Sequence, residues 1–91
     1  MKSNDVGVTY FEEDRDKPPF RIRIGGTSEF VSMIDPTWKR AWPPGKGEVV
    51  QGWDNERALI FQTLDEAINA AVNVWNIEGF HTSIESMHES R

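Results

Sequence analysis

The sequence contains no cysteine, which excludes disulfide bonds, thiolate catalysis and cysteine-ligated zinc. It also contains no apolar run near the roughly 20 residues that a membrane-spanning helix needs, so we expect no membrane partner. Residues 1–5 read Met-Lys-Ser-Asn-Asp, and no apolar stretch typical of a secretion signal follows them. These absences predict a cytoplasmic protein.

Motifs for catalysis are missing as well. Neither Gly25–Gly26 nor Gly45–Gly47 has the P-loop spacing, and no serine lies in a nucleophile elbow. His81, Glu85 and His88 would share one face only on a helix, whereas the residues between them favour a strand, which separates His88 from the other two. The sequence therefore predicts a protein that is not an enzyme and that needs no cofactor or metal.

The chain has 91 residues, which predicts one small domain spanning residues 1–91. Four tryptophans and five phenylalanines supply large apolar side chains, so we expect a folded core rather than a disordered chain. The net charge is −5, but residues 20–47 carry +3 and residues 48–91 carry −6. An acidic chain repels nucleic acid at long range, so direct nucleic-acid binding would depend on the basic segment alone.

Alternating or continuous apolar residues predict several strands. They lie at residues 6–10, 20–24, 30–34, 49–53 and 58–62, and a last candidate lies at residues 80–86. Within residues 20–24, Arg21 and Arg23 alternate with three apolar residues and face the opposite side of the sheet. Residues 20–34 together predict a hairpin.

One main helix is predicted over residues 64–78. Thr63 and Glu66 have the spacing of a capping box, and Gly79 is suited to end the helix. The predicted buried face consists of Leu64, Ile68, Ala71 and Trp75, and Ala67, Val74 and Ile77 widen it. The helix must pack on one face of the sheet, so we predict an α+β fold with an antiparallel sheet of about four to six strands.

The segment from Asp35 to Gly47 combines aromatic and basic residues in an otherwise acidic chain. Asp35 followed by Pro36 predicts the start of a helical turn over residues 36–41, ended by the prolines that follow. On such a turn, Trp38 and Trp42 lie on one side and the cations between them point toward solvent. The tryptophans are then either anchors for a partner or plugs at the edge of the core.

The candidate partner-binding residues are Trp38, Lys39, Arg40, Trp42, Lys46, Arg21 and Arg23. For the last two arginines, the alternative is that they pair with acidic residues on neighbouring strands. Occlusion or recruitment of a protein partner by this surface is the predicted function. The alternatives are a nucleic-acid-associated regulator that uses the same residues, a small enzyme or metal protein, and a homodimer.

Residues Ala58 to Ala67 have the pattern A-x-x-F-x-T-x-x-E-A. This pattern resembles a strand-to-helix junction of small α+β proteins of phages and mobile elements, some of which inhibit host defence systems, including anti-CRISPR proteins. The resemblance covers about ten residues and implies a phage-encoded inhibitor in the host cytoplasm, with a host protein or nucleoprotein complex as partner. It assigns no functional residue.

Overall fold

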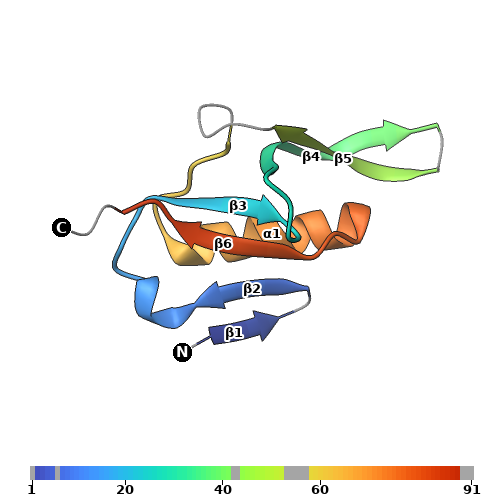
Figure 1. Ribbon diagram of the computed structural model, residues 1–91. Coiled ribbons are helices and arrows are strands. Elements are labelled where there is room, and N and C mark those ends of the chain that lie inside the picture. Colours follow the sequence, from blue (N-terminus) through green and yellow to red (C-terminus); the bar gives the residue numbers. More distant parts are fainter. Residues whose placement is uncertain (1, 6, 42–43, 53–57, 89–91) are drawn as a thin grey trace.

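The computed structural model describes residues 2–5, 7–41, 44–52 and 58–88. Its elements in chain order are β1 (Lys2–Asp5), β2 (Val8–Phe11), the 3-10 helix η1 (Glu12–Asp14), β3 (Phe20–Ile24), β4 (Phe30–Arg40), β5 (Gly45–Gly52), α1 (Leu64–Glu78) and β6 (Thr82–Ser86). The six strands form one sheet in the order β1-β2-β6-β3-β4-β5, and α1 packs against it (Figure 1). The predicted α+β class is confirmed.

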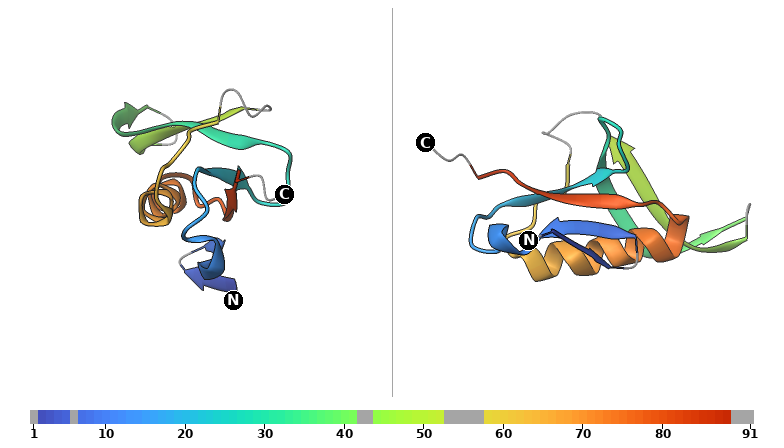
Figure 2. Two further views of the ribbon diagram at one scale, coloured as in Figure 1. Left: turned by 90° about the vertical axis from the view of Figure 1, so that its left-hand side faces the viewer. Right: turned by 60° about the horizontal axis from the view of Figure 1, so that its bottom comes forward.

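Neighbouring strands run antiparallel except for β2 and β6, which are parallel. The sheet curls around the helix, so that β4 and β5 lie on one side of α1 and β1 and β2 on the other (Figure 2). As a result, α1 contacts β2, β3, β4, β5 and β6. One helix is therefore enough to cover the apolar face of most of the sheet.

The core lies between α1 and the concave face of the sheet. Its buried residues are Val8, Phe20, Ile22, Ile24, Val31, Leu64, Ala67, Ala71, Val74 and Ile84. In β3 the predicted alternation is confirmed, because the three apolar residues are buried and the two arginines between them are only partly buried. The arginines thus belong to the convex face, which α1 does not cover.

The helix begins and ends where its capping residues predict. The Thr63 hydroxyl accepts a hydrogen bond from the Glu66 N–H at 3.2 Å. At the other end, Gly79 is left-handed and donates its N–H to the Trp75 carbonyl at 2.8 Å. The predicted bounds, residues 64–78, are confirmed.

The residues of the predicted buried face of α1 differ in how deeply they are buried. Ala67 and Val74 are fully buried, whereas Ile68 and Trp75 are only partly buried. Small alanine side chains let the helix approach the sheet closely, so the stripe that contains them faces the core directly. The larger residues pack at its margin.

The helical turn predicted at residues 36–41 is wrong, because β4 continues to Arg40. Asp35 does accept hydrogen bonds, from the Thr37 N–H at 3.0 Å and from the Thr37 hydroxyl at 2.7 Å. These bonds occur within an irregularity of the strand register between Asp35 and Lys39, where a proline is tolerated. Pairing with β5 therefore overrides the local helix signal.

The strand predicted at residues 58–62 is also wrong. Only an isolated bridge joins Phe61 to Phe20, with N···O distances of 2.8 and 2.9 Å. Leu59 donates its N–H to the Val31 carbonyl at 2.9 Å. The segment therefore contacts β4 first and then β3. It pairs with the start of β3, a position at which β4 does not pair with β3.

The remaining strands differ from the predictions mainly in their bounds. Two short strands, β1 and β2, occupy the N-terminal region, where one strand was predicted at residues 6–10. Val6, in that predicted strand, and Trp53, at the end of the predicted strand 49–53, lie outside the described residues. The last predicted strand is present as β6, in which Thr82 and Ile84 are buried.

Candidate interaction surface

The β4–β5 hairpin leaves the rest of the sheet soon after β4 begins. The only register pair between β3 and β4 is Arg23 with Phe30, whereas β4 and β5 pair from Phe30 to Arg40. The far part of the hairpin extends beyond the C-terminal end of α1, and the molecule measures 47 × 26 × 22 Å (Figure 1). We call residues 35–48 the arm.

The helix meets the hairpin at Gly47. A Cβ atom at this position would lie 2.6 Å from Ile77 Cγ1, and the backbone φ is +101°. Glycine is the residue that fits both the close approach and the left-handed region. Ile77 at the end of α1 therefore supports the base of the arm from the concave side.

Two apolar residues are exposed on the convex side of the hairpin. Met33 and Val50 lie directly opposite each other and are 40% and 38% exposed. Their neighbours Ile34 and Val49 form the next pair and pack against the core. A register shift at Ser32 separates Met33 from the buried Val31 and turns it to the other face.

The outer part of the arm is basic and aromatic. Trp38 is 52% exposed, and Lys39 and Lys46 are exposed and directly opposite each other. Among the described residues, neither lysine takes part in an ion pair. Residues 36–47 contain three cations, counting Arg40, and no acidic residue. Only the backbone of Arg40 is described, and Trp42 lies outside the described residues.

The predicted shared face of the two tryptophans assumed a helix, and that premise is wrong. On a strand, Trp38 and Lys39 are neighbours that point to opposite sides. Both side chains are nevertheless exposed to solvent, because no core lies against this part of the arm on either side. Of the two earlier interpretations of Trp38, the exposed one agrees with its position.

Acidic residues are found at the base of the arm. Asp35 and Glu48 are directly opposite each other in the register of β4 and β5. The hydrogen bonds from the Thr37 hydroxyl and N–H hold the pKa of Asp35 below its usual value. Asp35 therefore stays ionised at neutral pH, and the arm changes from acidic at its base to basic farther out.

Arg21 and Arg23 lie elsewhere on the convex face and form a compact cluster. Arg21 Nε donates to Glu85 Oε1 at 3.0 Å, and Arg23 Nη2 donates to the same oxygen at 3.2 Å. Their guanidinium carbons lie 4.2 and 4.7 Å from the ring centroid of Phe30, which is only 5% exposed. This is the cross-strand pairing that the alternative interpretation expected, and it gives both arginines a structural role.

Electrostatics favour the charged forms in this cluster. Burial raises the pKa of Glu85, but the hydrogen bonds from Arg23 and Arg21 outweigh it, so the pKa lies below its usual value. The hydrogen bond to Glu85 in turn raises the pKa of Arg23. The carboxylate is thus held ionised between two cations.

The structure does not bring all the candidate residues together. Phe30 begins β4, and Trp38 lies eight residues farther along the strand, roughly 25 Å away at about 3.3 Å per residue. Arg21 and Arg23 therefore do not form one patch with Lys39 and Lys46. The exposure of Met33 and Val50 is not predicted from the sequence, because simple alternation places Met33 on the same face as the buried Val31.

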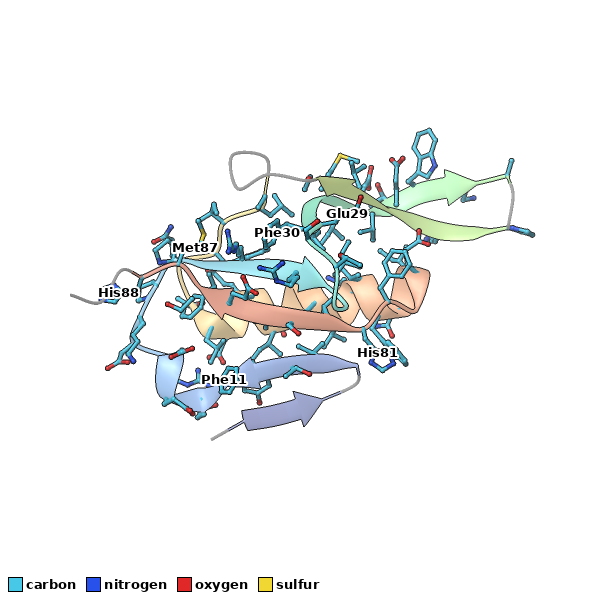
Figure 3. The ribbon with its side chains drawn as sticks, in the orientation of Figure 1. Phe11, Glu29, Phe30, His81, Met87 and His88 are labelled. Atoms are coloured by element: carbon cyan, nitrogen blue, oxygen red, sulfur yellow. The ribbon has the colours of Figure 1, made fainter. Side chains whose placement is uncertain are left out.

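No enclosed site accompanies these surfaces. The described residues form no pocket, and no three of their acidic or histidine side chains cluster closely enough to hold a metal ion. His81 and His88 lie at opposite ends of β6 (Figure 3). Neither described helix is both long and apolar enough to cross a bilayer.

Comparison of the chain with protein-family models, curated proteins and solved structures found no match in any of the three.

Proposed function

We propose that this protein is a non-enzymatic binding module that occludes or recruits another protein through its arm. The observation that supports the proposal is the exposed Trp38 on a projecting hairpin that also carries Lys39 and Lys46, neither of which forms an ion pair with a described residue. Tryptophan is the side chain that contributes most often to binding hot spots, and cations around it add electrostatic steering.

The support beneath the arm suits this role. Ile77 packs against the base at Gly47, and Asp35 accepts hydrogen bonds from Thr37 within the register shift of β4. A hairpin held in this way loses less conformational entropy on binding than a mobile loop does. An interface of roughly 800 Å² per partner is enough to block a site by occupancy, without any chemical step.

The phage-inhibitor version of this function rests on the resemblance of residues 58–67. That segment makes a single bridge rather than a strand, although the helix cap at its end is present. We retain a bacterial host protein, alone or in a nucleoprotein complex, as the proposed partner, and the arm as the surface that contacts it.

A nucleic-acid regulator is the second candidate, and the basic outer arm is the observation that favours it. Phosphate contacts would make such binding fall steeply with salt, whereas an interface anchored by tryptophan would weaken only mildly. The charge of the whole chain, −5, favours the protein partner, because it opposes approach of a polyanion.

Capture of partners from a bacterial lysate tests the proposal. Tagged wild-type protein is compared with Trp38→Ala/Lys39→Glu and with the control Phe11→Ala/Lys17→Glu, which changes an exposed aromatic residue and an exposed lysine outside the arm. Phe11 lies on the opposite side of the molecule from the hairpin (Figure 3). All samples are treated with nuclease, and circular dichroism confirms folding. We expect a protein that wild type and the control retain and the arm variant loses. Equal capture by all three contradicts the proposal.

A further inference from the structure

Among the described strands, none pairs with the outer edge of β5. β5 is the last strand of the sheet and has eight residues, and β4 is its only strand partner among the described segments. Ile77 lies where a Cβ of Gly47 would point, so the helix covers a face of β5 and not its hydrogen-bonding edge. An open edge of this length is a template for another extended chain.

The side chains of β5 give this edge a pattern. Val49 packs against the core, so its neighbours Glu48 and Val50 point to the convex face, and Lys46 precedes Glu48 by two residues. Lys46 is exposed and Val50 is 38% exposed. A strand placed beside β5 would therefore meet a cation, an anion and an apolar residue at every second position.

We infer that β5 binds an extended segment of the protein partner as a seventh strand, and that this segment carries an acidic residue beside Lys46 and an apolar residue beside Val50. The two residues are four positions apart in the segment, because the side chains of neighbouring strands lie in register. The inference rests on the proposed function and specifies how the partner is held.

A strand edge can pair with several kinds of extended chain. The positive charge of Lys39 and Lys46 favours a segment that is acidic. Lys39 and Lys46 are directly opposite each other, an arrangement that destabilises an isolated hairpin. An acidic residue placed beside Lys46 would relieve this repulsion. Among the described residues, neither Lys39 nor Lys46 takes part in an ion pair, so both can accept an acidic residue of the partner.

Two other occupants fit the observations less well. A second copy would present its own β5, which has Glu48 as its single acidic residue and brings the same cations with it. Nucleic acid cannot continue the backbone ladder of β5. The chain carries −5 in total and residues 36–47 carry +3, so the remaining −8 would repel it.

A random peptide library tests the inference. Peptides of about ten residues, enough for one strand, are selected against wild-type protein and against Lys46→Glu. We expect wild type to select peptides with Asp or Glu four positions from an apolar residue. The Lys46→Glu variant should bind these peptides at least tenfold more weakly and select Lys or Arg at the acidic position. Failure to select any peptide, or selection of the same peptides by both proteins, overturns the inference.

Backbone methylation then tests the strand geometry. In a paired strand, alternate N–H groups point toward the neighbour and the others point away. N-methylation of one alternate set in a selected peptide should abolish binding, while methylation of the other set should leave it within about twofold. Equal sensitivity of both sets overturns strand addition, even for a peptide of the expected charge.

Two further results would replace the inferred occupant. Concentration-dependent sedimentation of the wild type as a dimer that Lys46→Glu disrupts would point to a second copy. Tighter binding of a single-stranded oligonucleotide than of any selected peptide would point to nucleic acid. Either result overturns the inference but leaves the lysate experiment to decide the proposed function separately, because that experiment changes Trp38 and Lys39 and not the edge of β5.

Discussion

Lys39 and Lys46 are directly opposite each other across β4 and β5, with both side chains exposed. Like charges in this position destabilise a strand pair, whereas opposite charges stabilise it. The described residues offer neither lysine an acidic partner. A binding surface that needs positive charge gives a reason for this repulsion, which folding alone does not.

We therefore predict that Lys39→Glu stabilises the protein while it weakens partner binding. Replacing the like-charge pair with an opposite-charge pair should raise the free energy of unfolding by roughly 0.2–1 kcal/mol. Urea denaturation at low salt measures the change. The double variant Lys39→Glu/Lys46→Glu restores a like-charge pair and should lose the gain. A single variant less stable than wild type would contradict the cross-strand geometry.

The Glu85 carboxylate predicts a pH-dependent contribution to stability. Because its pKa is lower in the folded protein than in the unfolded chain, its stabilisation is present at neutral pH and is lost as the pH falls through the folded pKa. Glu85→Gln should lower the free energy of unfolding at pH 7 by about 1 kcal/mol, allowing for partial exposure. The difference from wild type should narrow as the pH falls below about 4.

Urea denaturation at pH 7 and pH 3 provides the measurement for Glu85. Asp16→Asn serves as the control, because Asp16 is exposed and forms no ion pair among the described residues. This control should change stability little at either pH. A loss in Glu85→Gln that is equally large at both pH values would show that the carboxylate charge is not the cause.

Gly47 predicts a steric effect at the base of the arm. In Gly47→Ala, the new Cβ would approach Ile77 Cγ1 to 2.6 Å in a backbone region that alanine rarely adopts. We expect a loss of about 2 kcal/mol or more in the free energy of unfolding. Gly26→Ala is the matched control, because no atom lies within 4 Å of its added Cβ and its φ is not in the left-handed region. Equal effects of the two substitutions would refute the contact.

We predict that replacing Thr82 with valine stabilises the protein. Its hydroxyl is buried and has no hydrogen-bond partner among the described residues. Thr82→Val keeps the shape and the β-branch but removes the unsatisfied group, so thermal unfolding should show a gain of roughly 1 kcal/mol. Thr82→Ser, which keeps the hydroxyl and loses the methyl group, should be destabilised instead. A clear loss in the valine variant would mean that the hydroxyl has a partner after all.

The elements that the sequence predicted well are those whose signals are local or strictly periodic. The helix at residues 64–78 carries its own cap at Thr63 and its own stop at Gly79. Phe20 and Ile22 face the core because alternation in a strand leaves no other choice. The same alternation places Arg21 and Arg23 on the opposite face of the sheet. Their pairing with an acidic residue on a neighbouring strand is one of the two interpretations that the sequence predicts.

The candidate surface was predicted only in part. Trp38, Lys39 and Lys46 were named from composition, and the structure places them together on the arm. The helical turn that the sequence predicts at residues 36–41 is absent, because β4 continues to Arg40. Arg21 and Arg23 lie in a separate cluster over Phe30. Composition identifies which residues can bind, but long-range pairing decides which of them become neighbours.

The class of fold, the two ends of the helix and the lack of cysteine chemistry follow from the amino-acid sequence alone. These depend on nearest-neighbour hydrogen bonding, on periodic burial and on residue type. Long-range pairing places Asp35 in an extended strand, because β5 supplies the backbone partners that favour a strand over a helical turn. It also determines the exposure of Met33, because a shift of one residue in strand register moves a side chain from the core to solvent.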